Sequence, residues 1–161
     1  MALSKDITPL IGLTYNIDSS PRIDLPEHTH SVDCRLLWQK YYHLRFGINL
    51  PIGLWSEEAF LDENLFRHLQ PNEKLIEGDT YFFGKKNDLP KSFHLAIFTG
   101  EWYQQDPLLI HASAFNGKTV TLDPLSKIIK TPQHAQIMGI KRLRPDLFQA
   151  HILPVVYNNA K

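Results

Sequence analysis

The spacing of apolar residues predicts a helix that begins near residue 34. Apolar side chains recur there at helical intervals, at Leu37, Tyr41 and Leu44. Ser31 or Asp33 can cap the start, and Gly47 is a natural end for the last turn. The segment before it, residues 16–33, is rich in proline and short polar residues and reads as irregular.

A second helix is predicted to begin after Ser56. Glu57 and Glu58 suit the positive end of a helix dipole in the first turn. Leucines then recur at a spacing of four, at Leu61, Leu65 and Leu69. Pro71 follows, so we expect this helix to extend close to residue 69.

After Gly78 the period shortens to that of strands. We expect strands at residues 80–83, 93–99, 108–113 and 119–122, with weaker candidates at 137–143 and 152–157. Helices followed by strands are typical of an α+β fold. The prediction is therefore an α+β domain in which N-terminal helices pack on a central antiparallel sheet.

Size and charge restrict the class of protein. The chain has 161 residues, of which 43% are hydrophobic, and this fits one globular domain spanning 1–161. Lys and Arg number 17 and equal Asp and Glu, so no positive excess exists to coat nucleic acid or an anionic membrane. We see no membrane-spanning stretch and no signal peptide. We therefore expect a cytoplasmic protein, and a phage-associated protein or a delivered effector is compatible with the same pattern. No cofactor is predicted, and the pattern does not indicate an oligomeric state.

The lone cysteine, Cys34, lies at the predicted start of the first helix. Free backbone amides and the positive helix end there favour a thiolate. The same amides can donate to an oxyanion that forms when a thiolate attacks a carbonyl. The alternative is an inert core cysteine on the apolar stripe of the helix.

Two histidines share one face of a predicted hairpin. Alternation places His94 with Ala96 and Phe98, and His111 with Leu109 and Ser113. If the hairpin closes across residues 99 and 108, His111 is the diagonal neighbour of His94. A shift of two residues makes the two histidines directly opposed, and in both registers they come within about 5–8 Å. Such a pair can be a base with its orienting partner, or two half-buried structural residues.

Four motifs in series resemble the NlpC family of papain-like cysteine peptidases. They are Asp33-Cys34 at a helix start with Gly-Ile-Asn-Leu-Pro at 47–51, Gly-Asp-Thr-Tyr-Phe-Phe at 78–83, His-Leu-Ala-Ile-Phe-Thr-Gly at 94–100, and Ile-His-Ala-Ser at 110–113. The resemblance runs in order from about residue 10 to 144. It implies a papain-like domain with a nucleophile, Cys34, a general base, His94, and an orienting third residue, His111. Tyr15, Asp33 and Arg35 become candidate oxyanion or substrate-binding residues.

The implied reaction is hydrolysis of the γ-D-glutamyl to diamino-acid bond in peptidoglycan stem peptides, with a peptide or wall fragment as substrate. Two departures leave this open. Arg35 replaces the usual Ser after the nucleophile, either to bind a substrate carboxylate or as a solvated residue, and residues 102–107 form an insertion. Alternatives are a papain-like acyltransferase or amidase on another substrate, an inactive binding module, or a metal site formed by His28, His30 and Cys34.

Overall fold

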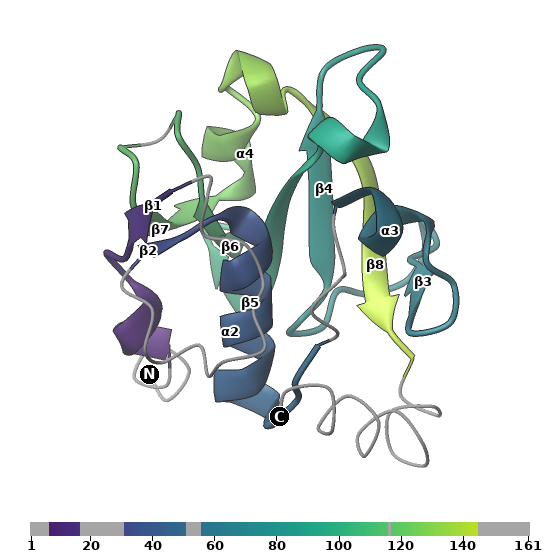
Figure 1. Cartoon of the computed structure of the whole chain (residues 1–161). Helices are drawn as coiled ribbons and strands as arrows, with labels where there is room; N and C mark the ends of the chain where they lie inside the picture. Colours follow the sequence, from purple (N-terminus) through teal and green to yellow (C-terminus); the bar gives the residue numbers. More distant parts are fainter. Residues whose placement is uncertain (1–6, 17–30, 51–55, 116, 145–161) are drawn as a thin grey trace. The chain divides into compact units, whose positions relative to one another are not determined.

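The computed structural model describes residues 7–16, 31–50, 56–115 and 117–144 (Figure 1). Its contacts divide the chain into two compact units. The first comprises Met1–Leu54, Ala112–Thr121 and Pro145–Lys161, and the second comprises Trp55–His111 and Leu122–Arg144. The chain therefore passes between the units just after Leu54, His111 and Thr121, and also after Arg144. A single domain over 1–161 stays a prediction.

Short elements surround one long helix in the first unit. They are the 3₁₀ helix η1 (Thr8–Leu10), the parallel strands β1 (Thr14–Tyr15) and β2 (Ser31–Val32), and the helix α2 (Cys34–Phe46). The start of β7 (Val120–Pro124) belongs here too, because the Val120 amide donates to the carbonyl of Leu13 over 2.8 Å. The amide of Tyr15 donates to the backbone carbonyl of Lys118 over 2.7 Å and so extends this pairing.

Helix α2 begins and ends where the sequence predicts. Asp33 is the N-cap, and its Oδ1 accepts a hydrogen bond from the Leu36 amide over 2.7 Å. Gly47 adopts the left-handed conformation at φ 67°, and its amide donates to the His43 carbonyl over 3.0 Å. Two residues of the expected stripe, Leu37 and Tyr41, are buried. The third, Leu44, is exposed, so the buried stripe is shifted toward Leu36, Trp38 and Tyr42.

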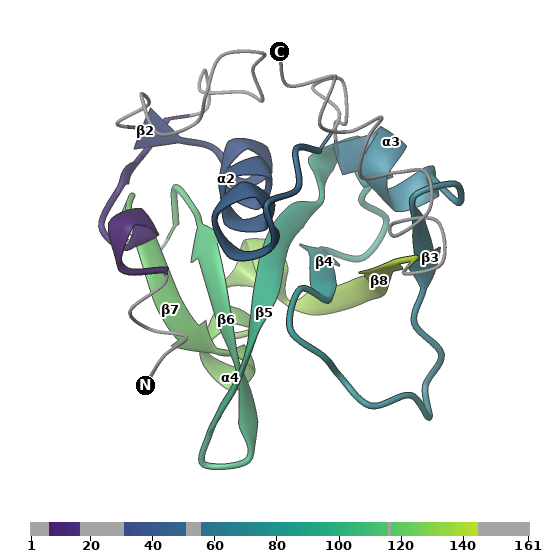
Figure 2. The same cartoon turned by 90° about the horizontal axis from the view of Figure 1, so that it is seen from below.

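A six-stranded sheet is the main feature of the second unit, with the order β3-β8-β4-β5-β6-β7 (Figures 1 and 2). The further strands are β3 (Phe66–His68), β4 (Thr80–Gly84), β5 (His94–Tyr103), β6 (Asp106–Ala112) and β8 (Gln136–Leu143). The pairs β3–β8, β8–β4, β4–β5 and β5–β6 are antiparallel. The expectation of an α+β protein with an antiparallel sheet is confirmed at this level. The candidate strand at 152–157 lies outside the described residues.

One face of this sheet carries an apolar cluster that alternation along the strands creates. Its buried members come from β4, β5, β6 and the short helix α4 (Leu125–Ile128): Tyr81, Phe83, Ala96, Phe98, Leu109 and Ile128. Since Ala96 and Phe98 are two and four residues after His94, the His94 side chain belongs to the same face. The cluster therefore continues into the histidine pair at one end.

The second predicted helix is wrong beyond residue 61. Helix α3 spans only Ser56–Leu61, and the Leu65 region turns into β3 instead. The Asp62 carboxylate accepts from the amides of Leu65 and Phe66, over 2.8 and 3.0 Å, which redirects the backbone. The buried ammonium group of Lys141 donates to the carbonyls of Phe60 and Asp62 and satisfies the end of the helix. Phe66, fully buried in β3, gains more from the sheet than from a helix surface.

The hairpin of β5 and β6 has the first of the two predicted registers. Ala96 lies opposite His111 and Phe98 opposite Leu109, and the Thr99 hydroxyl donates to the Leu108 carbonyl over 2.9 Å. A bulge follows, after which the strands continue through residues 102–107. Gln104 and Gln105, at φ 50° and 67°, form the tight turn. The expected insertion is thus a longer hairpin, which extends past the rest of the sheet in Figure 2.

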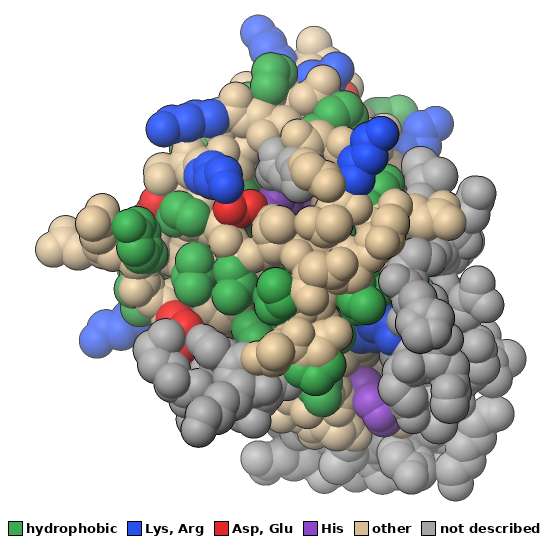
Figure 3. Space-filling view, turned by 90° about the vertical axis from the view of Figure 1, so that its left-hand side faces the viewer, with side chains coloured by type: hydrophobic (Ala, Val, Ile, Leu, Met, Phe, Trp, Pro, Cys, Tyr) green, Lys and Arg blue, Asp and Glu red, His purple; other side chains and the backbone are tan. Residues whose placement is uncertain are grey.

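Large hydrophobic side chains are also exposed at several positions of the described chain. Half or more of the surface of each of these is accessible: Leu61, Ile76, Leu89, Trp102, Tyr103 and Phe115. Figure 3 shows hydrophobic side chains exposed on one face of the molecule, with Lys and Arg mostly along the upper part of the view. Single exposed apolar residues are common in globular proteins. Among the helices described, none has the length and apolar character needed to cross a membrane.

A buried carboxylate connects the segment before β4 to β8. Asp79, whose side chain is fully buried, accepts from Arg142 Nε over 2.8 Å and from Arg142 Nη2 over 2.7 Å. The Ile76 amide donates to the same carboxylate over 2.9 Å. Removing one partner of such a pair destabilises the protein by more than the intact pair stabilises it, because the remaining charge stays buried without a partner.

We therefore expect Arg142→Met to lower the free energy of unfolding by about 3 kcal/mol, measured by urea denaturation. Arg67→Met is the matched control, because Arg67 pairs with Glu73 but is 40% exposed. The control should cost less than about 1 kcal/mol. Equal losses in the two variants would contradict the role given to the buried Asp79 carboxylate.

Candidate active site

A chain of hydrogen bonds connects two histidines to a carboxylate in the second unit. Nε2 of His94 lies 3.0 Å from Nδ1 of His111. Nε2 of His111 lies 2.8 Å from Oδ2 of Asp123, and Lys127 donates to Oδ1 of Asp123 over 2.8 Å. His111 is fully buried, and only 8% of His94 and 4% of Asp123 are accessible. We call these four residues the histidine relay.

Neighbouring elements of the sheet position the relay. His94 is the first residue of β5, and the register of the hairpin makes His111 its diagonal neighbour, as the sequence predicts. Asp123 is on β7, the next strand in the sheet. Lys127 lies four residues later, on α4, which directly follows β7.

A third imidazole packs on the first member of the relay. His134, in the 3₁₀ helix η4 (Pro132–His134), stacks on His94 with ring centroids 4.1 Å apart and planes 16° apart. Burial, then the neighbouring His134 and His111, lowers the pKa of His94 well below 6.5. Burial also lowers the pKa of His134 to about 4. His94 is therefore a neutral imidazole near pH 7, able to accept a proton.

Cys34 is the first residue of α2 in the first unit, and it is partly exposed. Its place at a helix start is confirmed. One detail of the expectation changes, because the Asp33 carboxylate already accepts from the Leu36 amide and so occupies one of the first-turn donors. That amide is not available to an oxyanion while the cap is in place.

Asp33 and Arg35 bind one another. Arg35 donates to Asp33 Oδ2 through Nε over 2.9 Å and through Nη2 over 2.5 Å. Only 13% of the Arg35 side chain is accessible, so this residue is not the solvated side chain that one of the sequence alternatives expects. Burial is the main reason that the pKa of Asp33 is raised above 3.8 despite these contacts.

Tyr15 lies near the same helix start, on β1 beside β2. Burial first, then the charges of Cys34 and Asp33, raises the pKa of its phenol above 10. The phenol is thus a neutral hydrogen-bond donor near pH 7. The six predicted site residues consequently fall in two groups: Tyr15, Asp33, Cys34 and Arg35 in the first unit, and His94 and His111 in the second.

Three site residues escape the sequence reasoning. Asp123 directly follows the predicted strand 119–122, and a carboxylate at a strand end is a recognisable polar signal. Lys127, four residues further on, can be assigned as a partner of Asp123 only once the position of α4 is known. His134 has no such pattern, since it is brought to His94 by the turn that contains η4.

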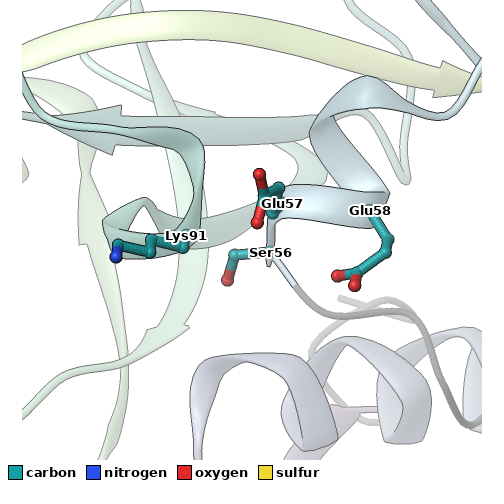
Figure 4. A pocket seen from close by; sticks show the side chains of 4 residues that line it. All are labelled: Ser56, Glu57, Glu58 and Lys91. Atoms are coloured by element: carbon teal, nitrogen blue, oxygen red, sulfur yellow. The ribbon is translucent and has the colours of Figure 1, made fainter.

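No group of three or more His, Cys, Asp or Glu in the described ranges is arranged to hold a metal ion. His28 and His30, the proposed ligands beside Cys34, lie outside those ranges. A pocket of about 320 Å³ also occurs in the second unit, between α3 and the 3₁₀ helix η3 (Pro90–Ser92). Figure 4 shows its lining side chains, Ser56, Glu57, Glu58 and Lys91, none of which belongs to the relay.

The chain was compared with known protein families and with curated proteins. No family model matches it, and no curated protein matches it. The chemistry of the site therefore has to be inferred from its own residues.

The buried imidazoles make stability depend on pH. In the unfolded chain both His94 and His134 titrate near 6.5, whereas in the native state their pKa values are lowered. Below pH 6.5 the unfolded state therefore binds more protons, and the native state loses stability as the pH falls.

We expect the free energy of unfolding to fall between pH 7.5 and 5, by up to ~1 kcal/mol per pH unit for each histidine, in urea titrations. His134→Phe keeps a stacked ring but removes one titrating group, so its pH dependence should be shallower. Identical slopes for the wild type and His134→Phe would contradict this origin.

Proposed function

We propose that the protein is a cysteine hydrolase in which Cys34 is the nucleophile, His94 the general base and His111 the residue that orients the base. The observation that carries the proposal is the buried contact of His94 with His111, continued to Asp123. A neutral imidazole held by a second group is what a thiol nucleophile needs as its base. The partly exposed thiol at the start of α2 supplies a group whose ionised form a helix end favours.

The proposed reaction has two steps. His94 removes the Cys34 proton, the thiolate attacks the amide carbonyl, and the His94 imidazolium returns the proton to the departing amine. A thioester between Cys34 and the acyl group results. Water then attacks the thioester with His94 again as base, which releases the carboxylic acid and restores the thiol. The proposal requires the thiol of Cys34 and the ring of His94 to meet in the working enzyme.

The NlpC-type papain-like fold is part of this proposal. Support comes from the order of the motifs, because a cysteine at a helix start precedes an antiparallel sheet with one histidine in each of two paired strands. On that basis the substrate is an amide bond in a wall peptide, with the γ-D-glutamyl to diamino-acid bond as first choice. Tyr15, a neutral phenol on β1, is the candidate oxyanion donor.

Arg35 favours a second candidate within the same chemistry. Its nearly buried guanidinium is paired with Asp33 directly beside the nucleophile, where a wall peptidase of this family carries a small Ser. Arg35 is larger than Ser and carries a positive charge, so its presence there favours an acyl group other than that of a wall peptide. An amidase or acyltransferase acting on a non-wall substrate is therefore the alternative.

We expect purified protein to cleave γ-D-glutamyl-diamino-acid peptides and Cys34→Ala to lower the rate by at least ~1000-fold. His94→Gln should have a similar effect and should also slow alkylation of Cys34 by iodoacetamide at pH 6. Circular dichroism of each variant verifies that it folds.

The outcomes separate the candidates. Turnover of acyl thioesters alone would replace the peptidase with the acyltransferase. Unchanged activity in Cys34→Ala would remove the catalytic role of the thiol. Alkylation of Cys34 at the same rate in the wild type and in His94→Gln would show that imidazole and thiol do not act together.

A further inference from the structure

The histidine relay contains one carboxylate, Asp123, which can only accept hydrogen bonds. Asp123 Oδ2 lies 2.8 Å from His111 Nε2, so this ring nitrogen must carry a proton. The other oxygen, Oδ1, is occupied by the Lys127 ammonium group over 2.8 Å. Lys127 is 65% exposed, whereas Asp123 is only 6% exposed at its side chain.

The position of the proton on His111 determines the position of the proton on His94. A neutral His111 with its proton on Nε2 presents a lone pair at Nδ1. Nε2 of His94, 3.0 Å away, must then be the donor. Since His94 is neutral too, its Nδ1 is left without a proton and is the basic atom. Lys127 already balances the charge of Asp123, so the fully buried His111 need not supply a second cation to this pair.

We infer that Asp123, held in place by Lys127, is a positioning residue that sets the tautomers of both histidines and so makes Nδ1 of His94 the proton acceptor. The inference deepens the proposed function, on which its consequence for catalysis rests. The tautomers themselves are a property of the folded chain and can be measured without any substrate.

Lys127 determines the orientation that an amide at position 123 would adopt, and this orientation can be tested. In Asp123→Asn an NH₂ group facing the Lys127 ammonium group would set donor against donor, so the amide oxygen faces Lys127 and the NH₂ group faces His111. His111 Nε2 must then accept, which moves its proton to Nδ1. Nε2 of His94 must accept in turn, and the proton moves to Nδ1 of His94, where it blocks the basic atom.

The test is nuclear magnetic resonance of the full chain with ¹⁵N-labelled histidine at pH 7.5, where ring nitrogen shifts distinguish protonated from unprotonated atoms. In the wild type we expect His94 and His111 to carry their protons on Nε2. Asp123→Asn should move both protons to Nδ1. Lys127→Met alone should keep both protons on Nε2, as in the wild type. In the double variant Asp123→Asn with Lys127→Met, part of the population should again carry both protons on Nε2.

A wild-type spectrum with His94 protonated at Nδ1, or with His111 doubly protonated, would overturn the inference even if the Asn variant does not fold. So would unchanged tautomers in a folded Asp123→Asn protein. In the activity assay Asp123→Asn should lower kcat by at least ~100-fold with little change in KM. Tautomers as expected in a protein whose activity survives Cys34→Ala would leave the inference standing and remove the proposed function.

Discussion

The register between β5 and β6 is the constraint on which the candidate site depends. Placing Ala96 opposite His111 puts both histidines on the face that also carries Phe98 and Leu109. A slip of one residue would turn the whole strand over and separate the imidazoles. The apolar side chains of that face therefore fix the geometry of the relay, since moving the register would expose them to water.

The local parts of this arrangement could be predicted from the sequence, because each has a short-range cause. Helix α2 follows from an Asp cap and a Gly end. Alternation places both histidines on one face of the hairpin, although it left two registers open and the structure selects the one that closes across residues 99 and 108. The predicted helix beyond residue 61 failed for a long-range reason. Lys141, about 80 residues away along the chain, binds the carbonyls at the end of α3, and no local pattern contains that contact.

The carboxylate end of the site was missed for a related reason. Asp123 was visible as a polar residue after a strand, but its partner could be assigned only once β7 was known to lie next to β6. Stacking of His134 on His94 likewise depends on the path of a turn. Sequence patterns thus identified the candidate nucleophile and the two histidines, whereas Asp123, Lys127 and His134 were found only in the tertiary structure.

The chain leaves the second unit directly after His111 and returns to it directly before Leu122. The hydrogen bond between His111 and Asp123 therefore joins the exit and the return of this excursion. Lengthening a loop whose ends are already tied costs little, about 0.6 kcal/mol for each doubling. Changes of length just before Lys118, whose carbonyl is paired with the Tyr15 amide, could thus accumulate over evolutionary time while the hydrogen bond between His111 and Asp123 stays intact.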